Sequence, residues 1–445
     1  MPDEPSPDAR PADARFDSER DAATGRIIVI DVLRGLAILW VMTFHLWTDM
    51  TGGLRGVSPL YEHLGDRIAE ANILGALTAA GELVLGSGYQ GVAVFMMLSG
   101  LSLVLNAERR GEPPAVRGYA ARLRKIVVPY WGGVLFLFAV FALIALAQTW
   151  TDGDTFRQQW DNVHVGVVAP VHYHLTDLPW AFTIFGPMLR DRVVTPPVAS
   201  LWFVPLLLQY YLLFPFALRI LRRIGPWNFA VAGIALAVVA RVLFYQLAPD
   251  VIDAPYLTRT IDTVFVFRGS EFFVGMSLGY LMAHRRREMS EWVASPLDVI
   301  GLIVVGVLLQ WASVSIQPDS QRVTAIFTPM GQLALALFAF PLLFKPRGRF
   351  EVSAPARALV ALGVISFTAL IVNDGMRLVA SFLRTQSLPD AVWWSFLWLV
   401  YIPGATALIA YPMARLFGLL PKRVASPAPA EQREIDGGAE IPAYV

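Results

Sequence analysis

Three ionisable residues, Asp31, Arg34 and His45, lie within or at the edges of an apolar stretch near the start of the chain. The stretch covers residues 26–47, close to the roughly 20 residues that a helix needs to cross a bilayer. Ionisable groups inside a membrane are costly and commonly mark substrate or proton pathways. Arg34 and His45 are eleven residues apart, which is roughly 16 Å along a helix and nearly the same face. They are therefore expected to line one passage at two depths.

His45 is the residue in this stretch best suited to proton transfer. Histidine has an unperturbed pKa near 6.5, and a general base typically accelerates a reaction about 10²–10⁴-fold. The alternative is that His45 is an interface residue beside Trp47, in the belt of amphipathic side chains at the membrane surface.

The composition places this helix in a polytopic membrane protein. Of 445 residues, 56% are hydrophobic and 16% charged, and the mean hydropathy is +0.53. Soluble domains are roughly 45–50% apolar and about 25% charged. The chain has no cysteine, which excludes disulfides, thiolate metal sites and a cysteine nucleophile.

The expected fold is an all-α bundle of ten membrane-spanning helices with both termini in the cytoplasm. The apolar stretch 70–86 is short and contains Glu82, so we expect an interfacial or re-entrant helix there. The ten predicted spans are 27–48, 88–107, 126–148, 199–218, 227–248, 260–283, 297–316, 324–344, 358–383 and 391–414.

The distribution of positive charge supports this topology. Every loop predicted to be cytoplasmic carries at least three arginine or lysine residues, whereas the outer loops carry fewer although they are longer in total. Basic residues concentrate on the cytoplasmic side of membrane proteins. The inner clusters lie within 109–125, 219–223, 285–287, 345–357 and 415–423.

The domain prediction is a membrane domain over residues 26–418 between two disordered cytoplasmic tails, 1–25 and 419–445. The one long connection, 149–198, falls outside and is expected to fold partly over the outer mouth. It contains His172 and His174, but no acidic ligand stands at a fixed offset. We therefore predict no metal site.

Further polar residues interrupt the later spans. Ser99 and Gly100 either allow close helix packing or line a narrow passage. Arg268 and Glu271 are three residues apart on one helix face. They form either a self-compensating ion pair or a charged lining of the same cavity. Asn373 and Asp374 also lie in an apolar context.

A basic cluster precedes the third span. Arg122 and Lys125 face one side of the helix where it enters the bilayer, and Arg124 lies between them. The cluster is either a general topology signal or a grip for a phosphate-bearing ligand from the cytoplasm.

Taken together, these motifs resemble membrane acyltransferase family 3. Members share an arginine or lysine, ten intervening residues and a histidine in the first helix, as Arg34 and His45 do here. The order and spacing of the motifs match from residue 26 to about 415. The other matching segments are GVAVFMMLSG (91–100), RLRKIVVPYW (122–131), LWFV (201–204) with QYYLLFP (209–215), and RGSEFFVG (268–275).

The chain departs from the family pattern at several positions. Lys125 stands where arginine is usual, and Leu207 and Leu208 replace a common pair of glutamates. Asn373 falls where many members have histidine. We expect no extracytoplasmic esterase-like domain of the kind that some members carry.

The resemblance implies acyl transfer from cytoplasmic acyl-CoA, with acetyl-CoA as the expected co-substrate and no bound cofactor. The acceptor would be a hydroxyl of an extracytoplasmic glycan, lipid or small molecule, at a bacterial inner or plasma membrane, with no nucleic acid involved. His45 would be the base, Arg34 would orient the donor or stabilise the oxyanion, and Asp31 would pair with Arg34. The expected substrate- and donor-binding residues are Arg122, Arg124, Lys125, Tyr130, Ser99, Trp202, Gln209, Tyr211, Arg268 and Glu271.

Two other classes of function remain open from the sequence. A multi-pass transporter or flippase would also have prolines and charges in its spans, although the two halves show no clear internal repeat. A non-catalytic binding or sensory membrane protein would fit the departures from the family pattern.

Overall fold

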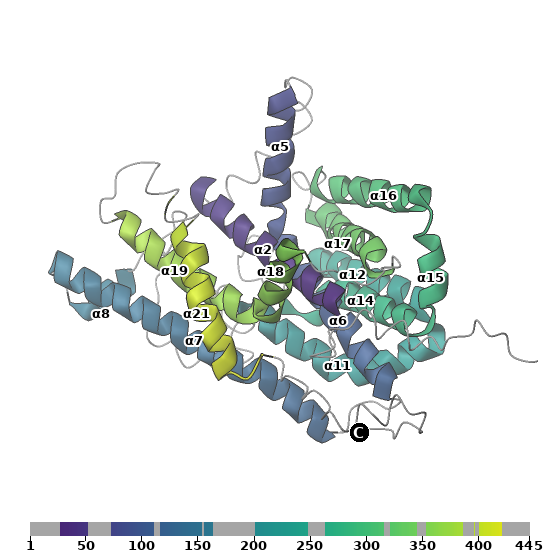
Figure 1. Cartoon of the computed structure of the whole chain (residues 1–445), viewed down its shortest axis with the longest axis horizontal. Coiled ribbons are helices and arrows are strands. Elements are labelled where there is room, and N and C mark those ends of the chain that lie inside the picture. The colour runs from purple at the N-terminus through teal and green to yellow at the C-terminus, as the bar shows by residue number, and fades with distance from the viewer. Residues whose placement is uncertain are drawn as a thin grey trace, which may run out of the picture.

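The structure is a computed structural model of the whole chain (Figure 1). The residues that it describes are 27–51, 73–110, 116–153, 155–162, 201–247, 263–315, 321–344, 353–385, 396 and 400–420. The predicted tail 1–25, the predicted tail 419–445 except for residues 419–420, and most of the loop 149–198, including His164, His172 and His174, lie outside these ranges.

Every regular element in the described ranges is a helix, as the composition predicted. In chain order they are α2 (Ile28–Thr51), α5 (Ile73–Gly86), the short η2 (Gly88–Gln90), α6 (Gly91–Arg110), α7 (Val116–Asp152), α8 (Phe156–Asn162), α11 (Phe203–Ile224), α12 (Pro226–Leu247), α14 (Phe265–His284), α15 (Arg286–Trp292), α16 (Pro296–Ser315), α17 (Gln321–Phe344), α18 (Ala354–Val364), α19 (Ser366–Thr385) and α21 (Ile402–Leu416).

Five of these elements are long and apolar enough to cross a membrane, or up to 7 if each bent helix pair is one span. The five lie in α2, in η2 with α6, and in α7, α11 and α12. The protein is therefore a multi-pass membrane protein. The predicted number of ten spans and the cytoplasmic placement of the termini stay predictions.

The predicted span 358–383 is not one straight helix. It is divided into α18 and α19, which meet at an angle of 83°. Ile365 lies at the break: its N–H donates to Ala361 O at the end of α18, and its own carbonyl accepts from Ala369 N at the start of α19. The continuous apolar run gave no sign of the bend. A second bend of 87° separates α15 from α16.

Glycines bring two pairs of helices into backbone contact. On α14, Gly275 packs against the Met97 backbone and Gly279 against that of Leu101, both on α6. On α2, Gly35 packs against the Leu359 carbonyl of α18. Small residues let membrane helices approach closely. In lipid there is no hydrophobic driving force between helices, so their association depends on such packing contacts.

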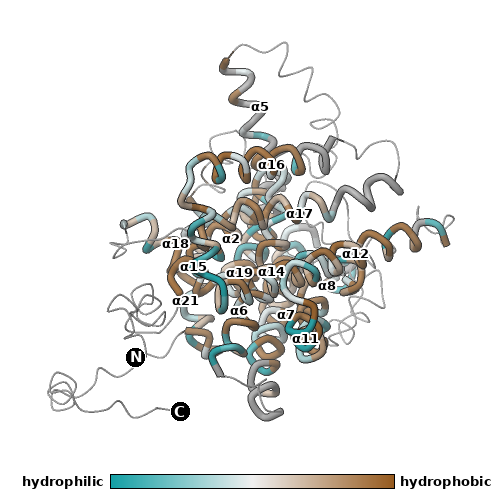
Figure 2. The backbone as a smooth tube through the Cα atoms, turned by 90° about the vertical axis from the view of Figure 1, so that its right-hand side faces the viewer, coloured by the Kyte–Doolittle hydropathy of each residue, from teal (hydrophilic) through white to brown (hydrophobic). Residues whose placement is uncertain are grey.

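Many large apolar side chains lie on the surface of the bundle. Large side chains such as Leu143 on α7, Val231 on α12 and Val307 on α16 are exposed, and Figure 2 shows hydrophobic residues along these outer helices. Such a surface suits lipid contact. Helix α5 projects away from the other helices (Figure 1), and its exposed Ile73 and Leu77 are consistent with the predicted interfacial helix.

Candidate active site

The first polar cluster lies at the beginning of α2. The Arg34 side chain donates to Asp31 Oδ1 from Nη1 at 3.2 Å and to Ser102 Oγ on α6 from Nη2 at 2.9 Å. Asp31 is buried, with 2% of its surface exposed. The predicted pairing of Asp31 with Arg34 is therefore present. Ser102 was not among the predicted residues, because its contact with Arg34 joins two helices.

His45 lies toward the other end of α2 and is partly buried. Its ring is 5.4 Å from that of Phe44. Within the described part of the chain, no hydrogen bond engages the imidazole.

A second cation lies near His45. The guanidinium of Arg377 on α19 is close enough to interact electrostatically with the imidazole. Arg377 Nη1 in turn donates to Asp374 Oδ1 at 3.1 Å. The sequence marked Asp374 as a polar residue of this span, but Arg377 was missed because nothing in its spacing links it to His45.

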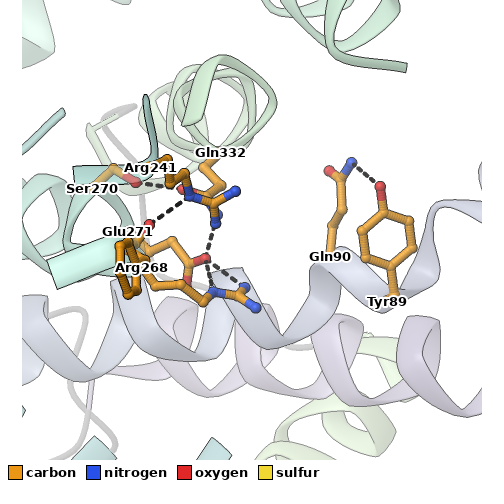
Figure 3. A network of polar contacts seen from close by, with 8 residues as sticks. Tyr89, Gln90, Arg241, Arg268, Ser270, Glu271 and Gln332 are labelled. Carbon is orange, nitrogen blue, oxygen red and sulfur yellow. Dashed lines mark hydrogen bonds and ion pairs between the residues drawn. The ribbon is translucent and has the colours of Figure 1, made fainter. Parts of the chain in front are cut away.

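The third cluster joins α14 to α11 and α17 (Figure 3). Arg268 donates to Glu271 Oε1 from Nε at 2.8 Å and from Nη2 at 2.5 Å. Gln332 of α17 donates to the same oxygen at 2.5 Å, and its own carbonyl accepts from Ser270. The Arg268 guanidinium lies 5.1 Å from the ring centre of Trp202, a cation–π distance. The predicted Arg268–Glu271 pair thus belongs to a larger buried network.

The remaining candidate residues make contacts that are typical of structural residues, within and between helices and in the core. Gln209 connects α11 to the start of α14, because it donates to Thr263 O at 2.8 Å and accepts from Phe265 N at 3.1 Å. Ser99 donates to Phe95 O of its own helix at 2.8 Å. Tyr130 is fully buried in the core, and Tyr211 packs against that core.

The predicted donor-binding cations lie on the first part of α7. Arg124 and Lys125 are both exposed, and they are available to a ligand from solution. Arg122 is part of the same helix, but its side chain lies outside the described residues.

Three helix ends predicted to be cytoplasmic meet at one end of the bundle. Glu108 of α6 accepts from Arg222 of α11 at 3.0 Å through one oxygen. Its other oxygen lies 2.9 Å from His284 Nε2 of α14. The Arg34 cluster belongs to the same end, because Ser102 lies on α6 less than two turns from Glu108. The two polar ends of α2 therefore face opposite ends of the bundle.

Comparison with known protein families gives one match. The model of the acyltransferase 3 family, described as an acyltransferase domain, covers residues 27–414. Comparison with curated proteins and with solved structures gives no match.

Proposed function

This chain belongs to the acyltransferase 3 family and is a membrane acyltransferase, and we propose that it transfers an acetyl group from cytoplasmic acetyl-CoA to a hydroxyl of an extracytoplasmic acceptor. The acceptor is a glycan, a lipid or a small molecule. One observation carries the proposal: a single spanning helix holds a paired arginine at one end of the bundle and a partly exposed histidine toward the other.

His45 acts as the general base. It accepts the proton of the acceptor hydroxyl while that oxygen attacks the thioester carbonyl carbon. The tetrahedral intermediate then collapses, the carbon–sulfur bond breaks, and the proton passes from His45 to the leaving thiolate of CoA. This role is supported by the lack of a hydrogen bond to the imidazole among the described residues, since a base must reach the proton that it removes.

The donor enters from the opposite end of the bundle. Arg122, Arg124 and Lys125 bind the CoA phosphates, for which cations near the helix entry are suitable. Arg34 orients the donor arm. It is eleven residues from His45, roughly 16 Å along α2, too far to touch the same carbonyl oxygen. Arg377, which is within electrostatic range of His45, is better placed to stabilise the oxyanion.

Radiolabelled acetyl-CoA added to inverted membrane vesicles tests the proposal. We expect release of CoA and transfer of label to a glycan, lipid or small molecule. His45→Gln should lower this rate about 10²–10⁴-fold. Thr43→Ala is the matched control, because Thr43 lies on the same helix and, among the described residues, its hydroxyl donates to the Trp40 carbonyl. Full transfer by a normally expressed His45→Gln protein would contradict the assignment of the base.

Transport is the second candidate function. The 83° break between α18 and α19 resembles the discontinuous helices that form transporter sites. Net movement of an unmodified solute across the vesicle membrane, without consumption of acetyl-CoA, would favour a transporter or flippase over the enzyme.

A further inference from the structure

A continuous chain of polar contacts runs from Ser270 through Gln332 and Glu271 to Arg268 (Figure 3). Its members come from α14 and α17, and it ends on the ring of Trp202 beside α11. Ser270, Glu271 and Gln332 are all buried. The chain is therefore shielded from competing water, where its hydrogen bonds are stronger than at a surface.

The donors and acceptors in these contacts determine the orientation of the Gln332 amide. An ionised carboxylate can only accept hydrogen bonds, so the Gln332 Nε2 group must face Glu271. Its Oε1 atom then faces Ser270, which can donate through its hydroxyl. Gln332 thus holds the Glu271 oxygen that receives both contacts from Arg268.

This chain lies at about the depth of His45. Helices α6 and α14 run parallel, because Gly275 packs on Met97 and Gly279 on Leu101. Arg268 lies seven residues before Gly275, and Gln90 lies seven residues before Met97. Because the helices are parallel, Arg268 is level with Gln90, the last residue of η2. Gln90 is also drawn in Figure 3.

The start of η2 then connects this level to α2. Gly88 packs directly on Trp40 and on Phe44, the neighbour of His45. Arg268 therefore belongs to the half of the bundle that contains His45, away from Arg34.

We propose that Ser270 and Gln332 are positioning residues, which hold Glu271 and through it fix Arg268 and its contact with Trp202 at the depth of His45 to receive the acceptor. This inference rests on the proposed acyl transfer. The ligand recognised there is a polar, hydroxyl-bearing group, since arginine offers hydrogen-bond donors and tryptophan offers an apolar face. A small displacement of Arg268 misaligns the acceptor oxygen with the base, and misplacement by about 1 Å can lower a rate about 10²-fold.

The experiment measures label transfer from radiolabelled acetyl-CoA in inverted vesicles, for Ser270→Ala and Gln332→Glu. Gln332→Glu keeps the side-chain size but sets a second carboxylate against Glu271. We expect the maximal rate to fall about 10- to 100-fold, while KM for acetyl-CoA stays within about twofold, because the donor binds at the other end. Ser270→Thr keeps the hydroxyl and should recover most of the rate.

Ser277→Ala is the matched control. Ser277 is another buried serine of α14, but it donates to the Phe273 carbonyl of its own helix. A purely structural role would give Ser270→Ala and Ser277→Ala the same rate, and that result would overturn the proposal.

A double variant tests whether Ser270 affects the rate through Arg268. If Ser270 acts only through Arg268, then adding Ser270→Ala to Arg268→Ala causes no further loss of rate. If the rate losses of Ser270→Ala and Arg268→Ala multiply in the double variant, the proposal is overturned. If the wild-type protein transfers no label, the proposed function and this inference both fail. A wild type that transfers label, with a Ser270→Ala variant as active as Ser277→Ala, removes the inference alone.

Discussion

Gly35 of α2 packs directly against the backbone carbonyl oxygen of Leu359 in α18. The contact is reciprocal, because Gly363 of α18 packs against the carbonyl oxygen of Asp31. Two glycines thus hold α18 antiparallel to the first half of α2. This contact supports the helix turn that carries Asp31 and Arg34, and so it sets the position of the proposed donor end.

Replacing Gly35 with alanine should destabilise the protein. The added methyl group meets backbone rather than a flexible side chain, and overpacking of this kind typically costs about 1–3 kcal/mol. We expect a lower Tm in detergent and reduced acetyl transfer. Gly301→Ala on α16 is the control, because no atom lies within 4 Å of its added Cβ. Equal Tm values for the two variants would show that α2 and α18 do not pack in this way.

Variants of the Asp31–Arg34 pair should distinguish its effect on stability from its effect on acetyl transfer. Arg34→Gln leaves the buried Asp31 carboxylate without this cation, and loss of one partner of a buried pair costs up to about 3–5 kcal/mol. Arg34 itself is 25% exposed, so the effect should fall below that range. Adding Asp31→Asn removes the stranded charge and should restore most of the Tm.

Acetyl transfer should stay low in the double variant, because the donor has lost its orienting cation. Thermal unfolding and vesicle labelling of the same preparations measure the two effects. Recovery of transfer together with the Tm would assign the pair a structural role alone.

The exposed cations of α7 should determine the affinity for acetyl-CoA. Hydrogen bonds to charged groups contribute about 1.5–3 kcal/mol, so Arg124→Ala or Lys125→Ala should raise KM for acetyl-CoA roughly tenfold or more. The increase should shrink at high salt, which screens exposed charges. Lys125→Arg should lower KM, since a guanidinium can bind phosphate through two parallel hydrogen bonds.

Arg157→Ala provides the control for these variants. Arg157 is an exposed arginine on α8, beyond the opposite end of α7. A KM that changes equally in Arg157→Ala and Arg124→Ala would indicate general electrostatic attraction instead of a phosphate site.

Glu108 should stabilise the contacts among the ends of α6, α11 and α14. Its partners Arg222 and His284 are partly exposed, and such ion pairs contribute about 0–1 kcal/mol each. Glu108→Gln should therefore lower the Tm slightly, and high salt should lessen the difference. Glu288→Gln, in an exposed pair with Arg285 on α15, should leave the Tm unchanged. A larger drop for Glu288→Gln would contradict the proposed importance of Glu108.

Local sequence patterns were sufficient for features contained within one helix. The apolar runs predicted the positions of α2, α6 and α12, because a bilayer requires about 20 consecutive apolar residues. Arg268 and Glu271 were paired from their spacing, since residues three apart share a helix face. The pairing of Asp31 with Arg34 was instead part of what the family resemblance implied.

Contacts between helices were not predictable in this way. Ser102 and Gln332 each bond a partner across a helix interface, and Arg377 of α19 interacts electrostatically with His45 of α2. No periodicity within one helix marks such interactions. The bend between α18 and α19 was missed for a related reason. The apolar run continues through the break at Ile365, so hydropathy alone does not mark it.

The parallel contact between α6 and α14 has a consequence for how the protein is made. Parallel neighbours cannot be joined by a short turn, and here α14 begins at Phe265 whereas α6 begins at Gly91. At roughly 5–20 residues per second of synthesis, α6 is inserted about 10–35 s before α14 emerges. During that interval, the face of α6 that bears Met97 and Leu101 contacts lipid or a transient partner. The half of the bundle that carries Arg268 is therefore completed late in biogenesis, after α7, the helix proposed to bind the donor, is already in place.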